Sequence, residues 1–293
     1  MYQRVLLVFN PDSHQSRKNA DRASDVLSSM GVFCNRIEAN SRESLKAFLS
    51  NSPDMLEMLR TQSCLLVVLA SPGVMLNCVS IFGDLIEGAA GVYSMDHQSD
   101  VLMDFPFHEF MVHLPEVLMG LTPSDERTIS IAELHNGINL SPHQIPFTSD
   151  LVISNSTLDG DFETSISFGR YGIAKFELNT FAVALPTGTT RYALSLGGPV
   201  VSPSLDCWTC VPCGQRPLSL RPFLLPQSEP LEITIHSSDK LFLLVDGQER
   251  IPVPPNAKLV IKKNPKPIRF LHPKSWNYFS DLQDLLNWQR LPI

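Results

Sequence analysis

A short run of glycine, threonine and tyrosine residues has the composition of a nucleoside-binding segment. Residues 185–192 read Leu-Pro-Thr-Gly-Thr-Thr-Arg-Tyr, and Ser195, Gly197 and Gly198 follow. Glycine lets the backbone approach a flat or charged ligand closely, threonine hydroxyls donate and accept hydrogen bonds, and a tyrosine ring offers a stacking face. The same residue types are common in turns that only connect strands, so both interpretations are open at this point.

Three evenly spaced cysteines, Cys207, Cys210 and Cys213, suggest a metal or iron–sulfur site. A cluster of this spacing needs a fourth thiolate, but Pro217 stands where that cysteine would lie and no CxxC pair occurs elsewhere. The segment also has the pattern of a strand, on which Cys207 and Cys210 would point to opposite faces. We therefore expect buried structural cysteines and no metal site.

The histidines are scattered along the chain and form no recognisable catalytic pattern. His108 and His113 fall on one probable helix among mostly apolar neighbours. Solvated or hydrogen-bonded side chains are expected there rather than a pair of ligands. No Ser-His-Asp arrangement can be argued from the spacings.

The composition is that of an ordinary globular protein. The 293 residues are 43% apolar and 18% charged, which suggests about two domains with sizeable cores. A net charge of -7 without basic clusters argues against binding to nucleic acid or to a membrane surface. No apolar run is long enough to span a bilayer and the run 5–9 is too short for a signal peptide, so a cytoplasmic protein with reduced cysteines is expected.

Residues 1–122 alternate short apolar runs with helical patterns. The apolar runs are 4–9, 32–37 and 64–70, and the helical stretches are 19–30 and 41–60. Alternation of this kind predicts an N-terminal Rossmann-like α/β domain with a parallel sheet and helices on both faces.

Residues 123–265 change to short strands of alternating polarity and predict an all-β sandwich domain. The candidate strands are 128–131, 150–153, 163–168, 232–235 and 240–245. The pair Asp246-Gly247 is a typical hairpin turn. Helical spacing reappears at 278–288, so the tail 266–293 is expected to return to the N-terminal domain as a helix.

Several ordered segments resemble the NAD kinase family. Residues 185–192, then Gly197-Gly198-Pro199 and Pro203-Ser-Leu-Asp206, are similar to the family's TPTGSTAY, GGPIV and PSLD segments. Further similarities are LSxRP at 218–222, an Asn-Glu-like pair at Ser149-Asp150 before an apolar strand, Asp246-Gly247-Gln248, and the terminal Tyr278-Phe279 with Trp288. Together these segments cover most of residues 145–290.

This resemblance implies an activity and a set of site residues. The family transfers a phosphoryl group from ATP or polyphosphate, with Mg²⁺, to the 2′-hydroxyl of the adenosine ribose of NAD, which forms NADP. Its members usually form homodimers or homotetramers. ATP and Mg²⁺ are therefore implied as cofactors if the chain is active, and NAD or NADP as the ligand. The NAD-binding residues implied in this chain are Ser149, Asp150, Asn179, Thr187, Thr190, Arg191, Tyr192 and Ser195.

The dinucleotide half departs from the family pattern at several positions. Ser149 replaces Asn, Asn179 replaces Asp, Leu185 replaces Thr and Arg191 replaces Ala, while Gln215 and Arg216 replace Pro and His. Asn179 lacks the charge with which a carboxylate accepts two ribose hydroxyls. Arg191 instead brings a guanidinium that can pair with a 2′-phosphate and favour NADP over NAD.

The phosphoryl-transfer half departs further. The family has GGDGT after its third main strand, whereas this chain has Ala70-Ser-Pro-Gly-Val74. Pro72 stands in place of the catalytic Asp, offers no acceptor and removes a backbone donor, so the catalytic residue is unknown and Ser71 and Gly73 are remnants of the phosphate loop. The glycine-rich NxGRxGFL loop is replaced by residues 96–102, where Asp96, His97 and Asp100 suit a base or metal ligand but are expected to form a solvated loop.

Three hypotheses follow from these patterns. The first is a divergent NAD kinase. The second is a catalytically inactive NAD(P)-binding pseudokinase or sensor. The third is a structural or interaction protein that keeps only the scaffold.

Overall fold

The computed structural model describes residues 2–61, 63–93, 102–135, 142–155, 160–214, 220–237 and 240–289. The chain forms two compact units. Unit 1 comprises Met1–Glu126 and Ile268–Ile293, and unit 2 comprises Arg127–Pro267. Each unit has its own hydrophobic core.

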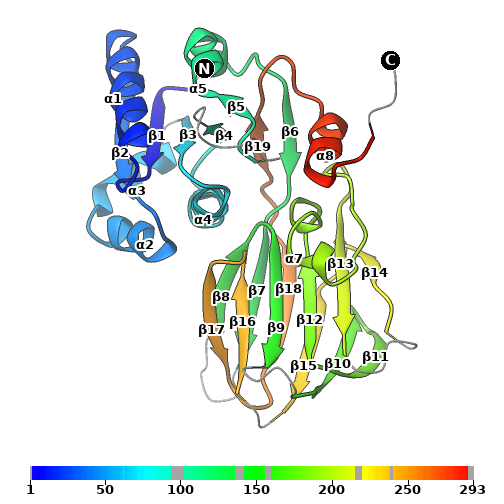
Figure 1. Cartoon of the computed structure of the whole chain (residues 1–293). Helices are drawn as coiled ribbons and strands as arrows, with labels where there is room; N and C mark the ends of the chain where they lie inside the picture. Colours follow the sequence, from blue (N-terminus) through cyan, green and yellow to red (C-terminus); the bar gives the residue numbers. More distant parts are fainter. Residues whose placement is uncertain are drawn as a thin grey trace. The chain divides into compact units, whose positions relative to one another are not determined.

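Unit 1 is built on a largely parallel sheet (Figure 1). Its strand order is β2-β1-β3-β4-β19-β6, and β5 pairs with β4. The strands are β1 (Arg4–Phe9), β2 (Phe33–Glu38), β3 (Cys64–Leu69), β4 (Gly88–Tyr93), β5 (Phe105–Pro106), β6 (Ser124–Arg127) and β19 (Ile268–Leu271). Every residue of β1 and β3 is buried, which is typical of a sheet that helices cover on both faces.

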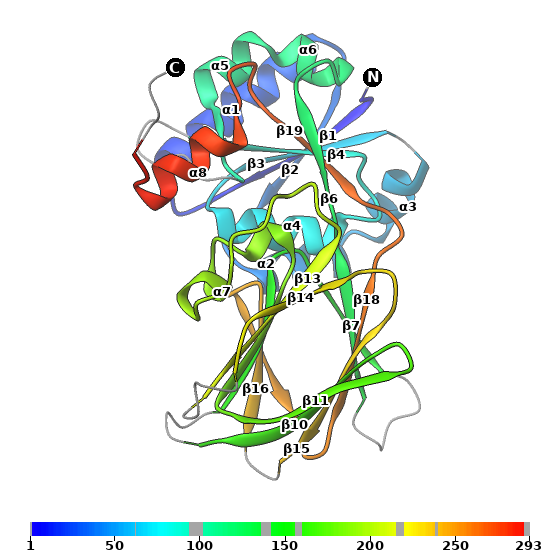
Figure 2. The same ribbon diagram turned by 90° about the vertical axis from the view of Figure 1, so that its right-hand side faces the viewer.

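The helices of unit 1 lie on both sides of this sheet (Figure 2). They are α1 (His14–Ser29), α2 (Arg42–Ser50), α3 (Pro53–Thr61), α4 (Pro72–Phe82), α5 (Phe107–Val112), α6 (Leu114–Met119) and α8 (Tyr278–Leu286). The helical stretch predicted over 41–60 forms two helices, α2 and α3, with a break at Asn51–Ser52 that the sequence pattern did not indicate. Pro53 causes the break, since a proline disfavours helical backbone at the residue before it. Helix α1 begins earlier than predicted because the Ser13 side chain caps it by accepting from the Ser16 N–H.

Unit 2 consists of two six-stranded antiparallel sheets that face each other (Figure 2). One sheet has the order β11-β10-β15-β18-β7-β8 and the other has β14-β13-β12-β9-β16-β17. The strands are β7 (Ser130–His135), β8 (His143–Phe147), β9 (Asp150–Asn155), β10 (Phe162–Phe168), β11 (Tyr171–Leu178), β12 (Thr180–Ala184), β13 (Cys207–Cys213), β14 (Phe223–Pro226), β15 (Leu231–His236), β16 (Leu241–Val245), β17 (Glu249–Val253) and β18 (Lys258–Lys263). A core of apolar side chains from both sheets fills the space between them.

The predicted fold class, a parallel α/β part followed by a β-sandwich, is confirmed. The C-terminal tail belongs to unit 1, where β19 pairs with β4 and α8 follows with Leu282 buried. Cys207 and Cys210 are buried on β13, and all six cysteines are free thiols. Among the described residues, no helix has the length and apolar character needed to cross a membrane.

Candidate functional site

The pair Ser149-Asp150 forms a tightly held corner at the start of β9 in unit 2. Asp150 pairs with Ala184 at the end of β12, and the Leu185 N–H donates to the Ser149 carbonyl at 2.8 Å. A one-turn 3₁₀ helix, η1 (Pro186–Gly188), and the short helix α7 (Tyr192–Ser195) follow directly. The loop that resembles a nucleoside-binding segment therefore starts beside Asp150.

Gly188 is required by the close approach of this loop to the corner. A Cβ atom at position 188 would lie 2.1 Å from the Ser149 carbonyl oxygen, closer than any side chain can come to backbone. Thr189 then fixes the loop, because its hydroxyl accepts from the Val201 N–H at 3.0 Å and donates to the Pro186 carbonyl at 2.9 Å. Gly188 and Thr189 thus fix the conformation of the loop, and neighbouring side chains are available to contact a ligand.

Asp150 is a buried carboxyl group with spare hydrogen-bonding capacity. Its side chain is 1% exposed, and its Oδ2 accepts from the Ser149 hydroxyl at 3.2 Å. Its Oδ1 has no hydrogen-bond partner in the part of the protein that the structure describes. Burial raises the pKa of Asp150 to about 6, against the opposing effects of the Ser149 hydroxyl, the Arg191 charge and the Tyr192 N–H. A buried acceptor of this kind suits a donor from a ligand, such as a ribose hydroxyl.

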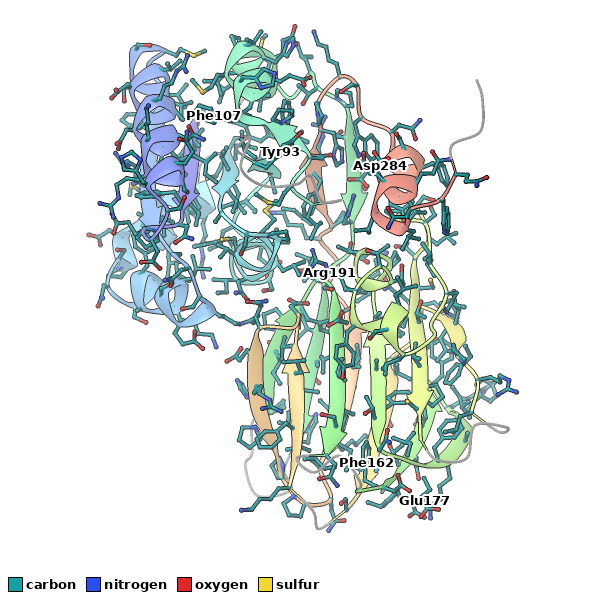
Figure 3. The ribbon with its side chains drawn as sticks, in the orientation of Figure 1. Tyr93, Phe107, Phe162, Glu177, Arg191 and Asp284 are labelled. Atoms are coloured by element: carbon teal, nitrogen blue, oxygen red, sulfur yellow. The ribbon has the colours of Figure 1, made fainter. Side chains whose placement is uncertain are left out.

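The side chains of the following turn lie at the same end of the strands. Arg191, labelled in Figure 3, is half-buried at the start of α7. It is near enough for its charge to act on the Asp150 carboxyl. Tyr192 is 37% exposed and offers a ring face. Ser195 is exposed, and its hydroxyl donates to the Tyr192 carbonyl at 2.7 Å. Thr187 is buried and Thr190 is half-buried.

Asp246 holds the corner from a distant part of the chain. Its carboxylate, at the tip of the β16–β17 hairpin, accepts from the N–H groups of Thr148, Ser149 and Asp150. Asp246-Gly247 is the turn that the sequence predicts, and φ angles of 51° and 67° confirm left-handed backbone there. The contact with residues 148–150 has no local sequence signal, because Asp246 lies 97 positions after Ser149.

Unit 1 has a cavity of about 260 Å³ at the carboxyl ends of its central strands. In the strand order, β2 lies on one side of β1, whereas β3 and β4 lie on the other side. The order of strand addition therefore reverses between β1 and β3, and open α/β sheets bind ligands at such a switch point. The lining residues are Asn10, Ser13, Ser16, Asn19, Leu69, Ala70, Ser71, Pro72, Val92, Tyr93 and Met103. The N-terminal ends of α1 and α4 contribute to this lining and favour an anion.

Ser71 and Pro72 form the start of helix α4 in this cavity. The Ser71 hydroxyl accepts from the Val74 N–H at 3.4 Å, and Pro72 occupies the first turn, where a missing N–H costs least. Tyr93 is the ionisable side chain in the lining, and burial together with Asp104, Glu109 and Asp281 raises its pKa. The lining residues include no carboxylate, imidazole or cationic group. The described lining therefore provides neither a general base nor the carboxylate ligands that Mg²⁺ prefers.

The similarity to known proteins agrees with this architecture. A model of the ATP-NAD kinase C-terminal domain matches residues 134–273. The NAD kinase of Shewanella halifaxensis is 30% identical over 244 residues, which are 81% of this chain and 76% of that protein. The chain belongs to the NAD kinase family. The aligned part covers 61% of the NAD kinase of Variovorax paradoxus and 97% of that of Shewanella woodyi.

Two solved family structures share the fold. Yeast NADH kinase complexed with NADH superposes with a TM-score of 0.81 at 20% identity, over 100% of this chain and 90% of that one. An NAD kinase from Archaeoglobus fulgidus in complex with ATP gives a TM-score of 0.68 at 16% identity, over 96% of this chain and 98% of that one.

Most of the NAD-binding residues predicted for this family member lie at one end of unit 2, but Asn179 does not. It precedes β12, and Ala184 at the far end of β12 pairs with Asp150 of β9. About five residues of strand, or about 17 Å, therefore separate the two positions. Figure 3 accordingly shows Arg191 and Glu177 at opposite ends of the unit. A single chain therefore does not bring Asn179 to Asp150. Asp96, His97, Asp100, Gln215 and Arg216 lie outside the described residues.

The candidate histidine pair on the helices of unit 1 does not form. His108 is exposed on α5, while His113 lies at the junction of α5 and α6 with its Nδ1 3.1 Å from Glu116 Oε2. The His113 ring is therefore engaged in a local contact with Glu116 and not with His108.

Proposed function

We propose that this protein binds NAD, or a phosphorylated or reduced form of it, through the Asp150 corner of unit 2. The observation that carries the proposal is the buried Asp150 carboxyl, whose Oδ1 accepts no hydrogen bond from the residues that the structure describes. Ribose hydroxyls are donors that would satisfy this oxygen. The exposed Tyr192 ring supports the proposal, because it can stack on an adenine, and Thr190 and Ser195 offer hydroxyls nearby.

The reaction expected of such a complex is the formation of NADP. The 2′-oxygen of the adenosine ribose attacks the γ-phosphorus of ATP, the bond between that phosphorus and the β–γ bridging oxygen breaks, and ADP leaves. The proton of the 2′-hydroxyl must pass to a base. Asp150 is our candidate for that base, since a carboxyl with a pKa near 6 is ionised at neutral pH but still accepts a proton.

A second candidate is an NAD(P)-binding protein without phosphoryl transfer. The cavity of unit 1 favours it, because the described part of its lining offers no carboxylate beside Pro72 to orient the hydroxyl or to hold Mg²⁺. Arg191 supports the same candidate, since a guanidinium beside the ribose site can bind a 2′-phosphate bidentately. In this case NADP is the preferred ligand.

One assay separates the two candidates. Purified protein is incubated with ATP, Mg²⁺ and NAD, and NADP is measured by glucose-6-phosphate dehydrogenase cycling, with Asp150→Asn as the comparison. The kinase proposal predicts NADP above the blank for the wild type and a large loss in the variant. NADP at the blank level, together with calorimetric binding of NADP, would establish the second candidate. If neither dinucleotide binds, both candidates fail and the third hypothesis, a structural or interaction protein, remains.

We also propose that the protein assembles as a homodimer or homotetramer, as its family resemblance implies. Light scattering coupled to gel filtration would show about two or four times the monomer mass of 32.6 kDa. A single monomer peak at micromolar concentration would contradict this proposal.

A further inference from the structure

The carboxylate of Asp246 is committed to three consecutive backbone N–H groups. Its Oδ1 accepts from Thr148 at 3.1 Å, from Ser149 at 2.7 Å and from Asp150 at 3.3 Å. All four residues are buried, with Asp246 only 3% exposed. Hydrogen bonds from N–H groups to an ionised carboxylate are stronger than those between neutral groups, and burial strengthens them further.

The backbone of Asp150 is tied to residue 246 on both sides. Its N–H donates to the Asp246 carboxylate, and its carbonyl accepts from the Asp246 N–H at 2.8 Å. The two bonds fix the position of the Asp150 Cα and hence the direction in which its carboxyl leaves the strand. The Ser149 hydroxyl, which donates to that carboxyl, starts from the residue whose N–H makes the shortest of the three bonds.

The turn itself does not require an aspartate at position 246. A hairpin turn with two left-handed residues accepts Asn-Gly at least as readily as Asp-Gly. Asn also brings an NH₂ group, which would face the three N–H donors, whereas an ionised carboxylate only accepts. The three N–H donors at residues 148–150 therefore explain why residue 246 is an aspartate. The hairpin turn explains only why its backbone is left-handed.

We propose that Asp246 is a positioning residue that holds Asp150 in the orientation needed to receive the dinucleotide. This inference rests on the proposed function of the Asp150 corner. Asp246 is not expected to touch the ligand, because its carboxylate is turned to the backbone of residues 148–150. Its effect on binding passes through Asp150.

The test compares Asp246→Asn with a variant that destabilises the same hairpin elsewhere. Val253→Ala truncates a buried side chain on β17, which pairs with Leu241 at the opposite end of the hairpin. The comparison is made when the two variants lower the Tm by similar amounts. We expect the NAD Kd measured by calorimetry to rise roughly tenfold or more in Asp246→Asn and to stay within about twofold of the wild-type value in Val253→Ala. Equal effects of the two variants, or an unchanged Kd in Asp246→Asn, would overturn the proposal.

A ligand-free readout separates this inference from the proposed function. ¹³C NMR of the side-chain carboxyl of Asp150 is followed against pH in the wild type and in Asp246→Asn. We expect its midpoint to fall by roughly one pH unit or more in the variant, toward the ordinary value for an aspartate, because the released carboxyl gains solvent. An unchanged midpoint would overturn the positioning role.

If the wild type binds neither NAD nor NADP, the proposed function fails, while the titration still decides whether Asp246 positions Asp150. Should Asp246→Asn not fold, Asp246→Ser takes its place, since a serine hydroxyl can accept one of the three N–H groups. Failure of both variants to fold would assign Asp246 to folding alone and overturn the proposal.

Discussion

Asp150, for which we propose a role in binding, also carries a cost in stability. Burial raises its pKa from 3.8 to about 6, so the folded state holds its proton more tightly than the unfolded state does. A raised pKa gives a contribution to stability that is fully present below pH 3.8 and is lost as the pH rises through about 6. At neutral pH the ionised carboxyl therefore destabilises the folded chain.

We predict that Asp150→Asn raises the free energy of unfolding at pH 7.5 by about 1–3 kcal/mol while it weakens dinucleotide binding at least about tenfold. The amide removes the charge that burial disfavours. Urea unfolding of both proteins at pH 4 and pH 7.5 measures the effect, and the gap between them should widen at the higher pH. If the difference in unfolding free energy between the two proteins is the same at both pH values, the Asp150 carboxylate is not destabilised by burial.

Arg191 is expected to set the choice between NAD and NADP. Because its guanidinium lies close enough to act on Asp150, a 2′-phosphate bound there would receive charge-assisted hydrogen bonds. We predict that Arg191→Ala shifts the ratio of the NADP and NAD dissociation constants toward NAD by roughly fivefold or more. Arg170→Ala, which removes an exposed arginine from the β10–β11 turn, is the control and should leave the ratio unchanged. If both variants shift the ratio equally, Arg191 has no specific role.

Individual site residues were predictable from the sequence to different extents. The predictions for Asp150 and for Thr187, Thr190, Arg191, Tyr192 and Ser195 rest on the resemblance to family motifs, which are short contiguous segments. Asp246 and Thr189 were recognised only as turn or motif residues. Their contacts depend on how strands β9, β12 and β16 align, which a local pattern does not contain.

At the scale of elements, the segment Ser71-Pro72-Gly73 is accounted for as the start of α4. A serine cap followed by proline is a favourable helix N-terminus. The replacement of the family's GGDGT by residues 70–74 therefore keeps the start of the helix but removes the Asp side chain. We predict that Ser71→Ala lowers the free energy of unfolding by about 1 kcal/mol in urea titrations, whereas Ser71→Asp retains it. Equal losses in both variants would show that the side-chain cap is unimportant.

The tail of the chain is held by a buried histidine between two aspartates. His272 is 2.5 Å from Asp104 through Nδ1 and 2.8 Å from Asp125 through Nε2, and its ring stacks on Trp276. Burial alone would lower the pKa of His272, but the hydrogen bonds and charges of the two aspartates raise it overall. Both ring nitrogens donate only when the imidazole is protonated.

We predict that the anchoring of the tail weakens as the pH rises. A histidine whose pKa is raised on folding contributes stability that is fully present below pH 6.5 and is lost as the pH passes its folded value. Hydrogen exchange of the α8 amides, corrected for the intrinsic rates, should speed up from pH 6 to pH 9 in the wild type. The same pH change should have little effect in His272→Gln, and equal behaviour of the two proteins would contradict the prediction.

Element boundaries show where sequence patterns were insufficient. The parallel sheet followed from solid apolar runs such as β1 and β3, and the β-sandwich followed from short alternating strands. The break between α2 and α3 was missed because hydrophobic periodicity continues across Asn51 and Ser52, and only the backbone effect of Pro53 interrupts it.

At the scale of the whole molecule, the chain keeps the fold of its family while its two units differ in what they retain. Unit 2 keeps a buried carboxyl and the shaped loop beside it. Unit 1 keeps a cavity at the reversal point of its sheet, but the described lining lacks a carboxylate. The position of Asn179 at the far end of β12 could not be predicted from a motif comparison, because a motif gives the order of residues and not their distance across a sheet.

Calorimetry decides whether unit 2 binds a dinucleotide through Asp150. NAD and NADP are titrated into the full-length wild type and into Asp150→Asn at pH 7.5. We predict saturable binding of at least one dinucleotide to the wild type, with roughly one site per chain, and a loss of affinity of at least about tenfold in the variant. Binding of equal affinity in both proteins, or no binding of either dinucleotide to the wild type, would contradict the claim.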